Sequence, residues 1–260
     1  MPQQQALIDL TLQLADNALI LGHRNSEWTG HGPILEQDIA ISNIALDLVG
    51  QARYFYQYAA RLLNESGESV TEDTLAYLRD GWDFKNCLLV EQTNGDWAKT
   101  ILRQFFFSAA QYYLYEGLQN SKDAELAAIS EKALKEVIYH LRWSSEWVIR
   151  LGDGTAESHS RMETALEDLW KFTGEMFIPA AYEDSLVQEG ITVEPSSLQF
   201  KWEEKVKEIF SEAGLLWPGT PSGKKGGLLA GGKEGRHTEQ LGYILAEMQF
   251  LQRAYPGCEW

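Results

Sequence analysis

Cysteine and basic residues are both scarce in this sequence. Its 260 residues include two cysteines, Cys87 and Cys258, which provide neither a disulfide framework nor the ligand spacing of a zinc site. Lysine and arginine number 22 against 38 aspartates and glutamates, so the net charge is −16. A negative field of this size repels the phosphates of nucleic acids and of anionic membranes, and we expect neither as a partner.

Long apolar runs are also missing. No run approaches the roughly 20 apolar residues that a helix needs to cross a membrane. The start of the chain, MPQQQ, lacks the basic and apolar parts of a signal peptide. Together with the low cysteine content, these absences predict a cytoplasmic protein.

Helical periodicity is the dominant pattern in the sequence. Apolar residues recur at steps of three and four, and no segment forms a convincing strand. The pattern predicts helices at about 5–22, 35–64, 97–120, 123–151, 157–177, 180–189, 195–213 and 237–253. Seven glycines from Gly219 to Gly235 predict a flexible loop at 219–235. We therefore predict an all-α fold in a single domain that spans residues 1–260.

Two sets of polar residues lie within these apolar helices. Asn43, Asp47 and Gln51 are spaced four apart and share one helix face. Glu136 and His140 have the same spacing on a later helix. Such residues could bind a metal ion, or they could form a hydrogen-bonded network between core helices, because buried polar groups require partners.

The number of available ligands decides between these two interpretations. A dinuclear iron site in a helical bundle uses about six side chains, and four of them are carboxylates from separate helices. The helix at 5–22 offers Asp9 and Asp16, but Leu19 and Ile20 occupy its later core turns. The helix at 97–120 offers one acid, Glu116, near its end. We therefore predict no metal, cofactor or catalytic site in this chain, and a metal-free polar core made of Asn43, Asp47, Gln51, Glu136 and His140.

The glycine-rich region contains two segments that resemble known motifs. A literal Glu-x-x-His occurs at 234–237, but a flexible loop is a poor place for a preorganised ligand pair. Residues 227–233 match the first seven positions of a phosphate-binding P-loop. Nucleotide hydrolysis is nevertheless excluded, because Glu234 stands where a magnesium-binding Ser or Thr is needed and no strand precedes the segment. Thr238 followed by Glu239 indicates the capped start of the last helix.

A small basic cluster lies in the same region of this acidic protein. Its members are Lys224, Lys225, Lys233 and Arg236. The cluster could bind an anionic ligand or an acidic partner, although a solvated loop is the simpler interpretation.

Four stretches match one protein family and follow that family's order. They are IALDLVGQAR at 44–53, LVEQTNG at 89–95, KE at 135–136 with YHLR at 139–142, and GRHTEQLG at 235–242 followed by LAEMQ at 245–249. These stretches are distributed over nearly the whole chain. In them the sequence resembles the structural subunits of bacterial ring-epoxidizing phenylacetyl-CoA monooxygenases, a family of phenylacetate-degradation proteins.

The resemblance implies a ferritin-like four-helix bundle with additional helices. It also implies a stable complex with a di-iron catalytic A subunit, which is a distant relative, and with further subunits. Such a complex inserts one oxygen atom into the aromatic ring of phenylacetyl-CoA, and a separate NADPH-dependent reductase subunit supplies the electrons. This chain would then be a non-catalytic structural subunit. An autonomous di-iron oxidase or oxygenase and a CoA-ester-binding module remain the alternatives.

The iron ligands of the catalytic relative provide a further comparison. The resemblance places its ligand positions near Leu19, Leu48 and Gln51, and on Val137 and His140 of this chain. Leucine and valine cannot bind iron. The resemblance therefore implies that the di-iron centre belongs to the partner and that this chain lacks one.

Overall fold

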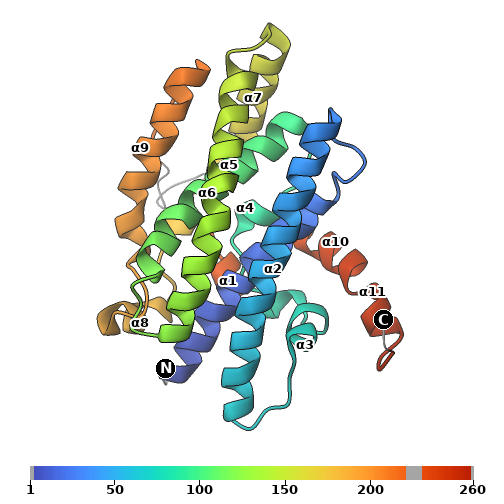
Figure 1. Cartoon of the computed structure of the whole chain (residues 1–260), viewed down its shortest axis with the longest axis vertical. Coiled ribbons are helices and arrows are strands. Elements are labelled where there is room, and N and C mark those ends of the chain that lie inside the picture. Colours follow the sequence, from blue (N-terminus) through green and yellow to red (C-terminus); the bar gives the residue numbers. More distant parts are fainter. Residues whose placement is uncertain (1–2, 221–229, 259–260) are drawn as a thin grey trace. The chain divides into compact units, whose positions relative to one another are not determined.

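The computed structural model describes residues 3–220 and 230–258, and helices dominate it (Figure 1). No strand occurs in these two ranges, which confirms the predicted fold class, an all-α, ferritin-like helical bundle with additional helices. The α-helices are α1 (Gln3–Ser26), α2 (Leu35–Glu65), α3 (Glu72–Tyr77), α4 (Leu88–Glu91), α5 (Trp97–Leu118), α6 (Ala124–Gly152), α7 (Ala156–Leu169), α8 (Glu183–Glu189), α9 (Pro195–Ala213), α10 (Glu239–Met248) and α11 (Phe250–Ala254). Short 3₁₀ helices are η1 (Gly81–Asp83), η2 (Trp170–Phe172), η3 (Gly174–Phe177) and η4 (Gly232–Glu234).

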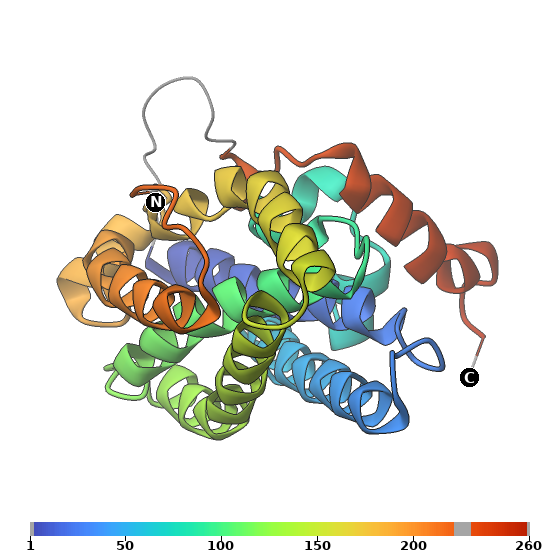
Figure 2. The ribbon, with the colours of Figure 1, turned by 90° about the horizontal axis from the view of Figure 1, so that it is seen from above.

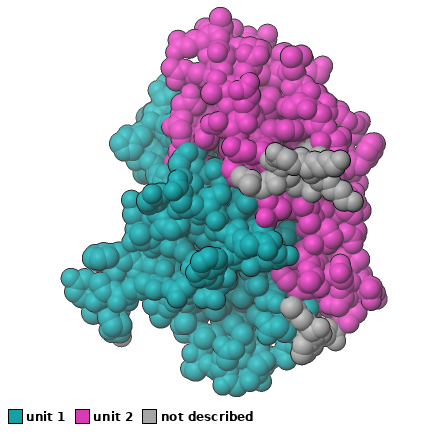
Figure 3. Space-filling model, turned by 180° about the vertical axis from the view of Figure 1, so that it is seen from behind, with its two compact units in different colours: residues 1–93, 231–260 teal, residues 94–230 magenta. Residues whose placement is uncertain are grey.

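The chain forms two compact units, which Figure 3 shows in teal and magenta. Unit 1 contains Met1–Thr93 and Gly231–Trp260, and unit 2 contains Asn94–Ala230. That the whole chain acts as one domain stays a prediction. Within the described part of the chain, no helix combines the length and the apolar character that a membrane span requires.

Unit 1 is built on the pairing of α1 with α2, which lie side by side in Figure 1. Their inner faces bury aliphatic and aromatic side chains such as Ile8, Ile44 and Phe55. Gly22 allows a close approach, because a Cβ atom there would lie 3.2 Å from Val49 Cγ2. The C-terminal helices α10 and α11, red in Figure 2, belong to the same unit, and α10 contacts α4 and η1.

Unit 2 is built on the pairing of α5 with α6, and α7 and α9 pack against that pair. Its aromatic core includes Phe106, Trp170 and Trp202, whose indole Nε1 donates a hydrogen bond to the Phe106 carbonyl at 2.9 Å. Side-chain caps mark the starts of α5, α6 and α7, and at the start of α6 Asp123 accepts from the Leu126 amide at 2.8 Å. These three helices therefore begin where the sequence supplies an acceptor for otherwise unpaired amides.

Two predicted helices differ from the structure: the one at 237–253 is divided into α10 and α11, and the one at 157–177 changes its winding. The segment expected as a continuous helix at 157–177 is α-helical only to Leu169 and continues as η2 and η3. Thr173 Oγ1 donates to the Trp170 carbonyl at 2.8 Å, three residues back, and a local bond of this kind accompanies the tighter 3₁₀ winding. Apolar residues recur through both windings, so the sequence pattern alone does not distinguish them.

Candidate functional site

Two of the family-like stretches meet in unit 1 around the carboxylate of Glu91. Glu91 ends α4 and is fully buried. Its Oε1 accepts hydrogen bonds from the amide and the hydroxyl of Thr238, both at 2.7 Å. Its Oε2 accepts from Asn86 Nδ2 at 2.9 Å and lies 2.9 Å from His237 Nδ1. Residues that are about 146 positions apart in the sequence thus form one buried cluster, which we call the Glu91 cluster (Asn86, Glu91, His237 and Thr238).

Backbone geometry places the Thr238 and His237 side chains in this cluster. Thr238 is the N-cap of α10, as predicted, and its Oγ1 accepts from the Gln240 amide at 3.3 Å. Gly235 has a φ of +79°, and a Cβ atom there would lie 2.2 Å from the Trp82 carbonyl oxygen. Only glycine fits this position, because it tolerates the left-handed conformation and leaves room for the Trp82 backbone.

The same cluster is tied to α1 through the backbone of Glu91. Arg24, in the last turn of α1, is buried and donates from Nε and Nη2 to the Glu91 carbonyl at 3.2 and 3.0 Å. Three separate segments, α1, α4 and the start of α10, are therefore joined at one residue.

His237 is held in its charged form by two acceptors. Its Nε2 lies 2.9 Å from the Phe84 carbonyl, and its Nδ1 faces the Glu91 carboxylate. An imidazole that donates from both nitrogens carries a positive charge. Burial alone would lower the pKa of His237, but the hydrogen bond to Glu91 and its negative charge, with smaller contributions from the Phe84 carbonyl and Asp16, raise it above the usual 6.5. The Glu91–His237 pair is therefore a buried ion pair.

This raised pKa predicts a pH-dependent contribution to stability. Because folded His237 binds its proton more tightly than the unfolded chain does, the pair stabilises fully below pH 6.5. The contribution declines as the pH rises through the raised pKa, by about 1.4 kcal/mol for each unit of the shift. Urea unfolding of the wild type and of His237→Gln at several pH values between 6 and 9 measures it. We expect the difference in unfolding free energy to shrink with rising pH; a constant or growing difference would contradict the ion pair.

A second buried carboxylate in unit 1 has equally complete bonding. Asp16 of α1 accepts from the Tyr56 hydroxyl at 2.5 Å, from the Lys85 amide at 2.8 Å, and from Nη1 (3.2 Å) and Nη2 of Arg79. Arg79 also lies over the Phe84 ring, 4.3 Å from its centroid. Burial first and the charge of Asp16 second raise the pKa of Tyr56 well above its usual value, so the phenol stays a donor. We call these residues the Asp16 cluster (Asp16, Tyr56, Arg79 and Lys85).

The bonding of both carboxylates limits their chemistry. Each carboxylate has about four lone-pair sites. Glu91 meets four donors within its cluster and Asp16 meets four within its own. Neither group keeps an accessible lone pair for a substrate or a metal ion. The arrangement is suited to holding segments together and not to acid–base catalysis.

The sequence did not point to the Glu91 cluster as a site. In the structure, the two side chains of the literal Glu-x-x-His at 234–237 have different partners. Glu234 forms an ion pair with Arg236 at 2.6 Å, whereas His237 contacts Glu91. The available signal was that the stretches containing Glu91 and His237 both match the same family.

The predicted polar core is distributed over both units. On α2 in unit 1, Gln51 is buried, Asp47 is half-buried and Asn43 is exposed. On α6 in unit 2, His140 is fully buried and Glu136 is half-buried. A network that links the two sets stays a prediction.

Glu136 influences a neighbouring helix within unit 2. Burial first raises the pKa of Tyr115 on α5, the hydrogen bond from Gln111 opposes the change, and the charge of Glu136 raises the pKa further. This half of the predicted polar core thus acts electrostatically between α6 and α5.

Buried apolar side chains occupy the positions where the resemblance placed iron ligands. Leu19, Leu48 and Val137 are each almost completely buried. Across residues 3–220 and 230–258, no group of three or more His, Cys, Asp or Glu side chains is arranged to hold a metal ion. That the chain binds no metal stays a prediction.

The basic cluster and the P-loop-like segment lie partly outside the described residues, as does the predicted loop at 219–235. Lys224, Lys225 and residues 227–229 belong to the part that the structure does not describe. Of the described members, Lys233 is buried in η4 and Arg236 pairs with Glu234.

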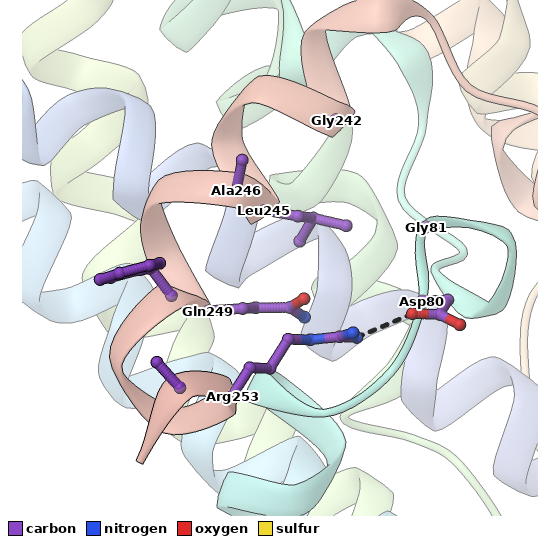
Figure 4. Close-up of a pocket in the computed structure, with 9 residues that line it drawn as sticks. Asp80, Gly81, Gly242, Leu245, Ala246, Gln249 and Arg253 are labelled. Atoms are coloured by element: carbon purple, nitrogen blue, oxygen red, sulfur yellow. Dashed lines mark hydrogen bonds and ion pairs between the residues drawn. The ribbon is translucent and has the colours of Figure 1, made fainter.

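A surface groove of about 550 Å³ lies between α10–α11 and the turn before η1 in unit 1 (Figure 4). Small residues such as Gly81, Gly242 and Ala246 contribute to its lining. Its two charged lining residues, Asp80 and Arg253, pair with each other at 2.8 Å. The lining therefore presents neither a nucleophile with an adjacent base nor an unbalanced charge for an ionic substrate.

The fold and its satisfied carboxylates define a helical-bundle protein whose buried acids serve its own architecture. The chain belongs to the family of phenylacetic acid catabolic proteins, whose model matches residues 1–260. It is 49% identical over 250 residues to the C subunit of 1,2-phenylacetyl-CoA epoxidase from Escherichia coli (strain K12), and the alignment covers 96% of this chain and 97% of that protein. These findings confirm the resemblance recognised in the four sequence stretches.

Proposed function

We propose that this chain is the structural subunit of a multicomponent phenylacetyl-CoA epoxidase. In this role it supports a catalytic A subunit that holds the di-iron centre, and it performs no chemistry itself. A reductase subunit supplies electrons from NADPH, and the complex works in the cytoplasm. The observation that carries the proposal is the 49% identity to the C subunit of such an epoxidase along almost the full length of both proteins.

Among the described residues, those at the positions where the resemblance expects iron ligands do not fit a di-iron centre. Leu19, Leu48 and Val137 are apolar where the resemblance expects ligands, and they are buried. The fully buried acids Asp16 and Glu91 are saturated by their own clusters. Oxygen chemistry is therefore assigned to the partner subunit, and the role left to this chain is architectural.

Co-expression with the catalytic A subunit tests the proposal. We expect the two chains to co-elute as one complex, and we expect epoxidation of phenylacetyl-CoA to require this chain together with the A subunit and the reductase. Full activity of the A subunit and reductase without this chain would overturn the proposed role. A second readout is the melting temperature of the A subunit, which complex formation raises by mass action.

The alternative of a CoA-ester-binding module has weaker support. It relied on a basic cluster of which Lys224 and Lys225 lie outside the described residues, while Lys233 is buried and Arg236 is paired. Calorimetric titration of the chain with CoA distinguishes the two functions, and the structural role predicts no binding heat.

A further inference from the structure

Helix α2 carries a row of exposed aliphatic side chains along its outer face. Leu35 is 72% exposed, Ile39 52%, Leu46 70% and Val49 41%. With Ser42 in the intermediate position, these residues follow steps of four, three, four and three. That spacing is the repeat by which one α-helix packs along another. We call this row the α2 seam (Leu35, Ile39, Ser42, Leu46 and Val49).

Most of the α2 seam lies away from the face that α2 uses within its own unit, and Val49 at its edge also borders α1 at Gly22. Ile41, Ile44 and Leu48 lie on the opposite side of the helix, are fully buried, and belong to the face paired with α1. An ordinary surface helix has one apolar stripe and a polar outer face. Helix α2 has two apolar stripes, and α1 covers one of them. An exposed apolar row of this length is typical of a surface that a partner covers.

Gly50 provides a second, independent observation beside the seam. It lies inside α2, where glycine is less favourable than alanine. A Cβ atom at Gly50 would meet nothing within 4 Å, whereas one at Gly22 would touch α2. No contact with the described residues therefore requires glycine at position 50. A helix approaching from outside would require it, because small residues allow two helix backbones to come close.

The charges beside the seam indicate the kind of partner. Glu36 and Asp38 lie on either side of its first turn, and Asp47 flanks its later part. Hydrogen bonds from the Gly32 and Gly30 amides lower the pKa of Asp38, so it is charged at neutral pH. A second copy of the chain would bring the same acids to the interface and would itself carry a net charge of −16. A different chain with basic residues beside its apolar row fits better.

We propose that the α2 seam is the docking surface for an α-helix of the catalytic A subunit. The docked helix carries aliphatic residues in the same three–four spacing and lysine or arginine on its flanks. Arg53, the next position along the row, pairs with Glu72 at 3.5 Å, and the apolar row ends there. The assignment rests on the proposed function and adds the face through which this chain supports the catalytic subunit.

Two substitutions and a matched control test the docking surface in the co-expressed complex. Leu46→Asp places a charge in the centre of the seam, and we expect the Kd for the A subunit to rise at least tenfold. Leu216→Asp makes the same chemical change at a side chain that is 82% exposed outside the seam, and we expect a change below twofold. Gly50→Leu adds bulk where the chain itself leaves space, so it keeps the fold and weakens the complex.

The outcomes separate this inference from the proposed function. If the wild-type chain binds the A subunit and both seam variants bind equally well, the docking surface is wrong while the structural role stands. If the wild-type chain does not bind the A subunit at all, both are wrong. A wild-type homodimer that Leu46→Asp converts to a monomer would make a second copy the occupant and overturn the assigned partner. Thermal unfolding of each variant shows whether it is folded.

Discussion

Replacing Glu91 with glutamine lowers the free energy of unfolding by about 3–5 kcal/mol, because it leaves a buried partner without its counter-charge. His237, whose side chain is 7% exposed, loses the carboxylate that balances it. The new side-chain amide would also turn one of the two oxygen acceptors into an NH2 donor. That donor would face either Thr238 or Asn86 and His237, which are donors themselves. Equilibrium urea unfolding at pH 7 measures the change.

A matched control distinguishes the cluster from a general effect of removing an acid. Glu247→Gln makes the same change at an exposed position on α10 in the same unit. Exposed substitutions of this kind usually change stability by less than about 0.5 kcal/mol. If Glu91→Gln cost no more than Glu247→Gln, the Glu91 cluster would not be holding α10 to α4.

Replacing Asp16 with asparagine should cost a similar amount, about 3–5 kcal/mol. Arg79, whose side chain is 12% exposed, then keeps a positive charge without its carboxylate partner. The Lys85 amide and the Tyr56 hydroxyl donate to the same group, so asparagine cannot accept from all of them. Urea unfolding measures the loss.

Asp73→Asn is the control for this second substitution. Asp73 is exposed in the first turn of α3, where an acid contributes less than about 1 kcal/mol through the helix dipole. Equal stability losses in Asp16→Asn and Asp73→Asn would contradict the structural role of the Asp16 cluster. Because the charge of Asp16 also contributes to the raised pKa of His237 and Phe84 contacts both clusters, we expect the losses of Asp16→Asn and Glu91→Gln to be non-additive.

Much of the helical architecture could be predicted from local sequence signals. Helix α9 begins at Pro195 and ends before Gly214, which has a φ of +69°, and its predicted bounds of 195–213 are correct. Thr238 was also correctly predicted as the start of α10. Such signals depend on neighbouring residues alone: proline fits the first turn of a helix, and glycine accepts the left-handed conformation after its end.

The clusters could not be predicted in the same way. Asp16 was recognised as a possible carboxylate ligand, but its partners Tyr56 and Arg79 are distant in the sequence and carry no shared pattern. The link between Glu91 and His237 spans most of the chain. Asn43 shows an error of the opposite kind. Its spacing with Asp47 suggests a position in the core, but in the structure Asn43 is exposed beside the α2 seam. Periodicity gives the faces of a helix but not which face the rest of the chain covers.

Metal analysis of the purified chain, expressed alone with iron supplied, tests the central claim most directly. The account assigns the di-iron centre to the catalytic A subunit and an architectural role to this chain. It predicts no stoichiometric iron in this chain and no dioxygen-dependent turnover of phenylacetyl-CoA, while the co-expressed complex contains iron and is active. A di-iron centre in the isolated chain, with turnover in the absence of the A subunit, would contradict the account.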